Sequence, residues 1–486
     1  MRLNNILKKY NSMSEQAKAG ICFVICSCFQ SGIKFVVLPI FANIMSVSDY
    51  GIVTLYTSWV SVIYIFATLA LGRANGVFYV AMVRYSEDRD VFTSAMEGLT
   101  IAMCLICFGF IYISTVFFGD WMNIGLTQYP AMCFELIGYG IILLWSLRMR
   151  YDYKYKQLLI ITFAYSVSSI FLPMLGVLFC PDNVSPAAIK NWCGAIASFI
   201  IGMVAFASTL KKSRRIFDLK YWKFAISFNL PLTPHYVSNV ILVQSDRIII
   251  AAIISEAAAA IYNVAYTLGV AAQVITQALI SAINPWMYKK MGDGEGNSVR
   301  KVILPLVILV AFYVLVICAI MPEVFNIFFP KAYSTALNVI PPVAVGVLWA
   351  FIFNLYISIE LYFSGNKLVS LSSVTGAALN VFANLILIPI FGFIAAAYTT
   401  LLSDIVYALM HTYFSHRLLK KNMPGTEVLP IVPIWLIGIL STLGCFMLLL
   451  LYPYPVVRYI IIGVALIFCF IDRDKIIRVV RFNSSK

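Results

Sequence analysis

Ionisable side chains stand inside stretches of the sequence that are otherwise apolar. Asp246 and Arg247 are neighbours in VQSDRIIIAAI, residues 243–253, and Lys34 stands in FQSGIKFVV, residues 29–37. A full charge near the centre of a bilayer costs on the order of 2.5 to 3.5 kcal/mol even on insertion scales, so such a residue usually faces a partner, a cavity or a substrate path. The two cations could therefore bind an anionic group, and the acid could pair or titrate.

The spacing around Asp246 predicts a polar stripe along one helix. On a helix that begins at His235, with about 100° per residue, Asn239 and Asp246 fall within about 40° of His235. Arg247 lies about 100° from Asp246, so the two neighbours face different sides and each needs its own partner. We expect Arg247 to face a ligand and the stripe to titrate or to fix helix packing.

Two prolines precede this stripe and predict a hinge. Pro231 and Pro234 lie in LPLTP, within an apolar run from 224 to 254 that is too long for one straight crossing. Proline removes a backbone donor and clashes with the preceding turn, so a kink or break is expected. The run is either one broken membrane helix or an interfacial helix followed by a span of about 20 residues.

Besides Arg247, the cations Lys34 and Arg73 stand in or near apolar runs. Lys34 shares a helical face with Gln30, four residues earlier. At its depth a lysine cannot easily extend to water, so Lys34 is expected to meet either an anionic headgroup or a buried carboxylate. Arg73, in LGRANG, is either a charge that sets topology or a second headgroup ligand.

Titratable residues also recur in the second half of the chain. Asp404, Tyr407 and His411 are spaced i, i+3 and i+7 in LLSDIVYALMH and share one helical face. A buried carboxylate and histidine can exchange protons near physiological pH, or they can simply fix packing. Glu360 and Glu135 stand near the ends of their apolar runs, where they either reach water or take part in coupling.

Other kinds of chemistry lack their motifs. The sequence has no GxxxxGK[ST] phosphate loop, no HExxH and no nucleophile elbow, and it has only three histidines. The 11 cysteines lie mostly within apolar runs, without metal-ligand spacing, where a thiol behaves as a small hydrophobe. We therefore expect neither an enzyme nor a bound cofactor or metal.

The composition predicts an all-α integral membrane protein. Of 486 residues 62% are hydrophobic and 12% charged, and the mean hydropathy is +0.90. About 20 apolar residues in a helix cross a bilayer, and about 14 such runs are found. Their expected limits are 19–45, 52–72, 94–118, 130–148, 157–180, 188–210, 224–254, 260–286, 302–321, 338–363, 368–390, 394–416, 430–452 and 456–471.

The basic residues predict the orientation of these spans. With a cytoplasmic N-terminus, only Lys190, Lys331 and Arg458 fall in outer segments, which also places the C-terminus in the cytoplasm. The first apolar run is too long for a signal-peptide core. The net charge of +14 is spread over the inner loops rather than gathered on one face, which favours contact with anionic lipid and argues against nucleic acid.

The chain is expected to contain two similar halves. A basic linker, residues 211–223, separates a six-helix bundle at 1–210 from a second one at 224–421, and residues 422–486 add two helices and a basic tail. A constant shift pairs Ile40 with Ile249 and Asn75 with Asn284. Six spans return the chain to its starting side, so such a duplication gives two pseudo-symmetric bundles, as in some secondary transporters.

The region from 221 to 269 resembles a known family. LPLTP, SDRIII and a small-residue turn followed by IYNVAY occur here in the order found between the seventh and eighth helices of polysaccharide-unit flippases, which belong to the multidrug/oligosaccharidyl-lipid/polysaccharide exporter superfamily. SVSDYGIVTLY, residues 46–56, resembles the family's first outer turn. The turn EAAAA departs from the glycine that the family more often has there.

The resemblance implies a flippase of the bacterial inner membrane. Its cargo would be an O-antigen or related surface polysaccharide repeat unit on undecaprenyl diphosphate, carried by alternating access with coupling to H+ or Na+. Lys34, Arg247 and Arg73 would then bind the diphosphate through charge-assisted hydrogen bonds. The same resemblance implies functional partners that make and use the repeat unit, namely glycosyltransferases and a polysaccharide polymerase.

Two other transport functions fit the same superfamily. A cation-coupled multidrug or metabolite exporter would need an acidic cavity lined by aromatic rings, and a peptidoglycan-precursor flippase would carry a related lipid. A membrane glycosyltransferase is disfavoured because the longest connections span only about 20 residues, too few for a catalytic domain.

Overall fold

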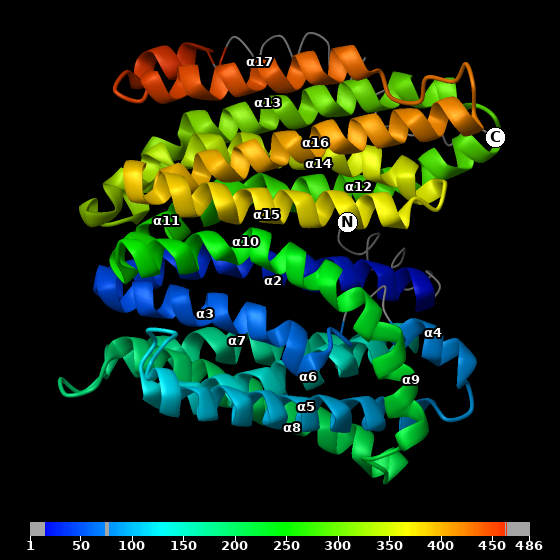
Figure 1. Cartoon of the computed structure of the whole chain (residues 1–486). Coiled ribbons are helices and arrows are strands. Elements are labelled where there is room, and N and C mark those ends of the chain that lie inside the picture. Colours follow the sequence, from blue (N-terminus) through cyan, green and yellow to red (C-terminus); the bar gives the residue numbers. More distant parts are fainter. Residues whose placement is uncertain (1–14, 73–76, 462, 464–486) are drawn as a thin grey trace, which may run out of the picture. The chain divides into compact units, whose positions relative to one another are not determined.

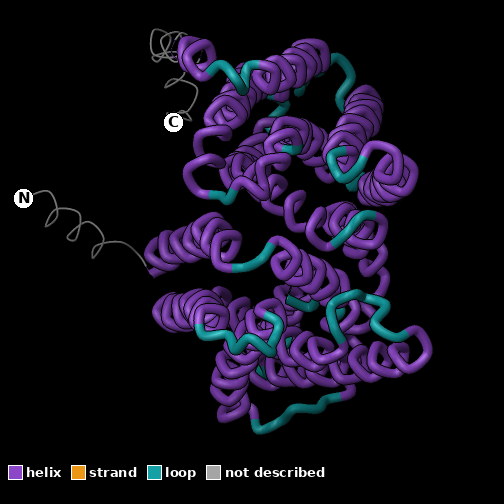
Figure 2. Tube along the Cα trace, turned by 90° about the vertical axis from the view of Figure 1, so that its left-hand side faces the viewer, coloured by secondary structure: helices purple, strands orange, loops and turns teal. Residues whose placement is uncertain are grey.

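The computed structural model describes residues 15–72, 77–461 and 463, which form helices and connecting loops (Figure 1, Figure 2). The α-helices are α2 (Glu15–Ile44), α3 (Val47–Thr68), α4 (Val77–Arg84), α5 (Arg89–Phe118), α6 (Tyr129–Tyr151), α7 (Tyr155–Leu178), α8 (Pro186–Ser213), α9 (Leu219–Asn229), α10 (Thr233–Ile253), α11 (Glu256–Gly269), α12 (Gln273–Gly292), α13 (Gly296–Phe328), α14 (Ile340–Tyr362), α15 (Asn366–Phe391), α16 (Ala395–Asn422) and α17 (Ile431–Leu450).

Short 3-10 turns interrupt or precede several of these helices. They are η1 (Leu126–Gln128), η2 (Leu230–Leu232), η3 (Val270–Ala272) and η4 (Lys331–Asn338). The turn η2 divides the expected seventh span into α9 and α10, as the prolines predicted. The turn η3 divides the expected eighth span, which the sequence did not indicate.

In the described part of the chain, 11 helical segments are long and apolar enough to cross a membrane. Most expected spans therefore match a helix, although helices such as α5 and α13 begin several residues earlier than hydropathy indicated. The expected span at 456–471 lies largely outside the described residues. The total of 14 and the cytoplasmic location of both termini stay predictions.

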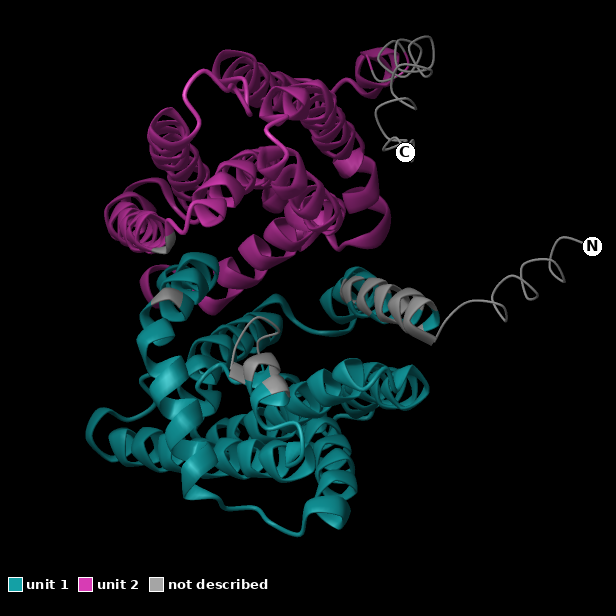
Figure 3. Cartoon of the chain, turned by 90° about the vertical axis from the view of Figure 1, so that its right-hand side faces the viewer, with its two compact units in different colours: residues 1–251 teal, residues 252–486 magenta. Residues whose placement is uncertain are grey.

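The chain divides into two compact units, residues 1–251 and 252–486 (Figure 3). The first unit includes α9 and most of α10, whereas the repeat in the sequence predicted that a second bundle begins at residue 224. Compact units group contacts rather than sequence repeats, so the predicted duplication and its linker at 211–223 stay predictions.

In unit 1, α6 lies against α8, α5 and α3. Glycines allow α6 and α8 to touch through their backbones: a Cβ atom on Gly138 would lie 2.3 Å from the carbonyl oxygen of Ser198, and one on Gly202 would lie 2.6 Å from Cα of Gly138. Such close approach by small residues is how helices pack in a membrane, where lipid supplies no hydrophobic drive for association.

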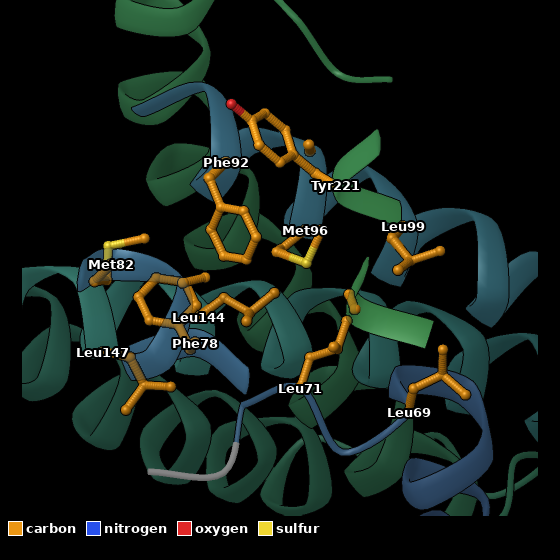
Figure 4. Close-up of a cluster of buried hydrophobic side chains, with 13 residues drawn as sticks. Leu69, Leu71, Phe78, Met82, Phe92, Met96, Leu99, Leu144, Leu147 and Tyr221 are labelled. Carbon is orange, nitrogen blue, oxygen red and sulfur yellow. The ribbon is translucent and has the colours of Figure 1, made fainter. Parts of the chain in front are cut away.

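A buried apolar cluster fixes α9 to the start of α5 (Figure 4). Tyr221 and Ala225 of α9 pack there against residues of α4, α5 and α6, including Phe78 and Phe92. The Tyr221 hydroxyl donates to Asp88 at 3.0 Å. Burial and this hydrogen bond raise the pKa of Tyr221 to about 12, so the hydroxyl remains a donor at physiological pH.

In unit 2, α14 occupies the centre, with α16, α13, α17, α11 and α12 against it. Trp349 of α14 is buried, donates to the Thr442 hydroxyl at 3.0 Å and packs on the Trp435 ring at 5.1 Å. Because most residues of α14 are buried, an ionisable group among them must find its partner inside the protein.

Candidate functional site

The structure joins two candidate residues from different helices of unit 2. Glu360 of α14 and His411 of α16 form a contact of 2.8 Å between Oε1 and Nδ1. Glu360 is 0% exposed and His411 1% exposed, so Glu360 does not reach water. The second carboxyl oxygen of Glu360 has no hydrogen-bond partner in the described part of the chain.

Aromatic rings enclose the Glu360–His411 pair. The imidazole stacks with Tyr407 at 6.1 Å and lies 6.0 Å from the Phe353 ring. The Tyr407 hydroxyl donates to the Ser373 carbonyl at 2.8 Å, which holds this ring in place. A carboxyl and an imidazole in an apolar enclosure can share or exchange one proton at little cost compared with burying two charges.

Asp404 lies on α16 two turns before His411 and is half-buried. One of its carboxyl oxygens lies 2.8 Å from the position that a Cβ atom on Gly346 would occupy. Any side chain at residue 346 would therefore displace the carboxylate. Asp404 thus packs closely against α14 rather than projecting away from it.

A ladder of buried polar side chains joins α15 to α16, and the sequence reading missed it. Asn384 donates to Asn380 at 3.1 Å, and Asn380 donates to Thr400 at 3.2 Å. Thr399 donates to Asn384 as well. The available signal was the pair of asparagines four residues apart in an apolar helix, a spacing that puts both amides on one face.

Asp246 and Arg247 are both buried in α10, at 0% and 5% exposure. The Arg247 guanidinium donates to the Val243 carbonyl one turn earlier on the same helix. Each residue of the pair also has further interactions. The structure therefore places both charges inside protein, although helical geometry turns them to different sides of α10.

The two prolines stand at the junction of α9 and α10. Pro231 lies within the 3-10 turn η2, and Pro234 lies in the first turn of α10. Asn229, the last residue of α9, is buried and donates to the Leu69 carbonyl at 2.9 Å, which fixes one side of this break. Asn239 of the predicted polar stripe is half-buried and has interactions of its own.

Three candidates are not characterised at the level of their side chains. Arg73 lies outside the described residues. Lys34 belongs to α2 and His235 to α10, but both side chains lie outside the described set. Their expected roles stay predictions.

Glu135 of α6 lies in a polar group of unit 1. It accepts a hydrogen bond from the buried Tyr56 hydroxyl at 2.9 Å and interacts electrostatically with Lys190 of α8. The Lys190 ammonium in turn lies 5.1 Å from the centre of the Phe41 ring. Glu135 therefore has a hydrogen-bond donor and a cation as partners, which sequence spacing did not indicate.

Two other buried ionisable groups were missed. Glu97 of α5 is 0% exposed and accepts from the Thr209 hydroxyl of α8 at 3.1 Å. Arg458, one of the three basic residues expected in outer segments, is 1% exposed and donates to both carboxyl oxygens of Glu323, at 2.9 and 2.6 Å. Glu97 stands among the apolar residues of SAMEGLTIAM, and that alone could have marked it.

The apolar helices and their buried ionisable groups define a multi-pass membrane protein, in agreement with the expected location in a bacterial inner membrane. The family model described as "Polysaccharide biosynthesis protein" matches residues 17–291, more than half of the chain. The chain therefore belongs to this family. No curated protein matches the sequence significantly.

Solved transporters share its fold. A structure titled "Lipid II flippase MurJ, inward closed conformation" aligns with a TM-score of 0.63 and 14% identity, over 93% of this chain and 99% of that one. A multidrug resistance MATE family transporter of the MOP superfamily, in an inward-facing conformation, aligns with a TM-score of 0.64 and 12% identity, over 83% of this chain and 99% of that one. At these identities the likeness shows a shared fold alone.

Proposed function

We propose that this protein is a flippase for undecaprenyl-diphosphate-linked oligosaccharides, the repeat units of an O-antigen or a related surface polysaccharide. The observation that carries the proposal is the match to the polysaccharide biosynthesis family over residues 17–291. The fold supports it, since one solved protein of this fold is a lipid II flippase. The cargo would pass from the cytoplasmic to the periplasmic leaflet by alternating access, after glycosyltransferases build it and before a polymerase uses it.

Arg247 is the residue proposed to bind the diphosphate. A guanidinium buried in a membrane helix has lost most of its hydration, so a doubly charged phosphate group would gain strong, charge-assisted hydrogen bonds from it. Lys34 and Arg73 are proposed to assist. The saccharide and the diphosphate would be shielded by protein, while the polyprenyl tail stays in lipid.

Proton coupling is proposed to use Glu360 and His411. The pair is fully buried and 2.8 Å apart, and one carboxyl oxygen is left without a partner in the described chain. Adding a proton to such a pair changes its net charge inside an apolar enclosure, where the cost of a charge is high. A change in proton occupancy can therefore shift a conformational equilibrium by several-fold.

The experiment is a chromosomal deletion with complementation. We expect the deletion to remove surface polysaccharide and to make undecaprenyl-diphosphate-linked repeat units accumulate in the lipid extract, as measured by mass spectrometry. Wild-type protein should restore export, and Arg247→Ala should not, although it reaches the membrane in normal amount.

The alternatives give different results in the same strain. Intact surface polysaccharide with increased drug sensitivity would indicate a multidrug exporter and reject the proposal. Accumulation of a peptidoglycan precursor, with normal polysaccharide, would instead indicate a cell-wall flippase. Export in vesicles that responds to a sodium gradient and not to a pH gradient would reject the proton coupling alone.

A further inference from the structure

Glu97 is a buried carboxyl group whose hydrogen-bonding capacity is only partly used. The Thr209 hydroxyl donates to its Oε1 atom at 3.1 Å, whereas Oε2 has no partner among the residues that the structure describes. The Thr100 hydroxyl, one turn further along α5, is buried and also lacks a partner there. An unpartnered acid oxygen and an unpartnered hydroxyl thus lie on one face of the same helix.

No charged group on the neighbouring helices compensates Glu97 in the part of the chain that the structure describes. Arg148 of α6 contacts Asp90 at 3.0 Å and Asp152 at 3.3 Å. Arg84 of α4 lies 5.2 Å from the Phe224 ring. The other charged side chains on helices packed against α5 are Asp49 of α3, Glu135 and Arg150 of α6, Lys190, Lys211 and Lys212 of α8, and Lys220 and Lys223 of α9, and the segment between α8 and α9 adds Arg214, Arg215 and Asp218. In the described chain, Glu97 interacts with none of them; its polar contact is Thr209.

An ionised carboxylate in this position would lack any compensating charge. Moving an isolated ion into a low-dielectric interior costs many kcal/mol, and a side chain avoids that cost by taking up a proton. A protonated carboxyl carries no charge that needs compensation, so burying it costs far less than burying the ion. We propose that Glu97 is a proton-binding site and that it holds a proton at neutral pH.

The proposed site lies beside the segment that joins α8 to α9. Ser94 donates to the Arg215 carbonyl at 2.5 Å, and the Trp222 indole donates to the Ala95 carbonyl at 2.8 Å. A Cβ atom on Gly98 would lie 2.2 Å from the Ile216 carbonyl oxygen. Segment 215–222 therefore rests directly on α5 next to Glu97, and it limits access of water to the carboxyl.

Proton release and movement of this segment are expected to be linked. An ionised Glu97 needs water, but its side chain is 0% exposed and segment 215–222 rests on the neighbouring Gly98. Deprotonation should therefore favour states in which segment 215–222 has lifted from α5. This inference does not depend on the identity of the transported cargo.

Infrared spectroscopy of the purified protein tests the protonation state. We expect the wild-type spectrum at neutral pH to contain a protonated carboxylic acid band that is absent from Glu97→Gln and that disappears at alkaline pH. Glu323→Gln is the matched control: Glu323 is ion-paired with Arg458, so its removal should take away no such band. A wild-type spectrum identical to that of Glu97→Gln in this band at neutral pH would overturn the proposal.

Hydrogen exchange tests the link to segment 215–222. After correction for intrinsic rates, protection of this segment in wild type should fall at least several-fold between neutral and alkaline pH, while Glu97→Gln keeps it. Glu97→Leu is a second variant without a charge, and it should also keep the protection, even if the amide of Glu97→Gln disturbs folding. Equal protection of wild type at both pH values would contradict the link, and a loss of protection in both variants would show a merely structural role.

Discussion

The contact between Glu360 and His411 makes a quantitative prediction for stability. Glu360→Leu leaves a buried imidazole without its partner, and His411→Leu leaves a buried carboxyl without one. An unsatisfied buried polar group costs about 1 to 3 kcal/mol, so each single variant should lose about that much free energy of unfolding. Replacing both partners with apolar residues of similar shape removes the unsatisfied group and should be nearly neutral.

The assay is a double-mutant cycle by equilibrium unfolding in detergent. Since each single change costs about 1 to 3 kcal/mol and the double change is nearly neutral, the double variant should be more stable than the sum of the two single changes by about 2 to 6 kcal/mol. Tyr407→Phe is the control, since it removes the separate hydrogen bond to the Ser373 carbonyl and should combine additively with Glu360→Leu. If the Glu360 and His411 changes add within about 0.5 kcal/mol, the pair does not interact as the structure shows.

Three other substitutions test separate parts of the molecule. Arg458→Ala should lower the free energy of unfolding by about 2 to 4 kcal/mol, because Glu323 loses a bidentate partner. The loss is limited because the Glu323 side chain is 32% exposed and stays partly hydrated. Gly138→Ala should reduce both stability and membrane level, whereas alanine at Gly194, where nothing lies within 4 Å, should be tolerated. Arg247→Lys should retain part of the export that Arg247→Ala loses, as measured by surface polysaccharide, and full export by Arg247→Ala would exclude a headgroup role.

The helical architecture could be predicted because bilayer thickness acts on each span separately. A run such as 302–321 identifies α13 without reference to any other residue. The break at LPLTP was also predictable, since proline acts on its own helix. The short helix α4 and the turn η3 were not predicted, because they depend on packing and carry no comparable local signal.

The contacts of the candidate residues could not be predicted in the same way. Glu360 and His411 are 51 residues apart. Hydropathy places each of them in a helix, but it does not say which faces of the two helices meet. Glu97 stands in the third turn of α5, and it is buried where α5 packs against α8 and segment 215–222, a contact that hydropathy does not indicate. The sequence therefore reveals which polar residues are costly to place in a membrane, while the fold decides which of them lie together in one site.

Three buried or partly buried acids in this chain differ in the chemistry of their partners. Glu323 faces a guanidinium, Glu360 an imidazole and Glu97 a hydroxyl. A guanidinium stays charged and keeps its carboxylate ionised, so Glu323 cannot take part in proton exchange. An imidazole can lose or gain its own proton, and a hydroxyl carries no charge to offset a carboxylate. We therefore predict that Glu360 and Glu97 can bind and release a proton and that Glu323 cannot. Substituting Glu323 should change the stability of the protein but not the pH dependence of transport.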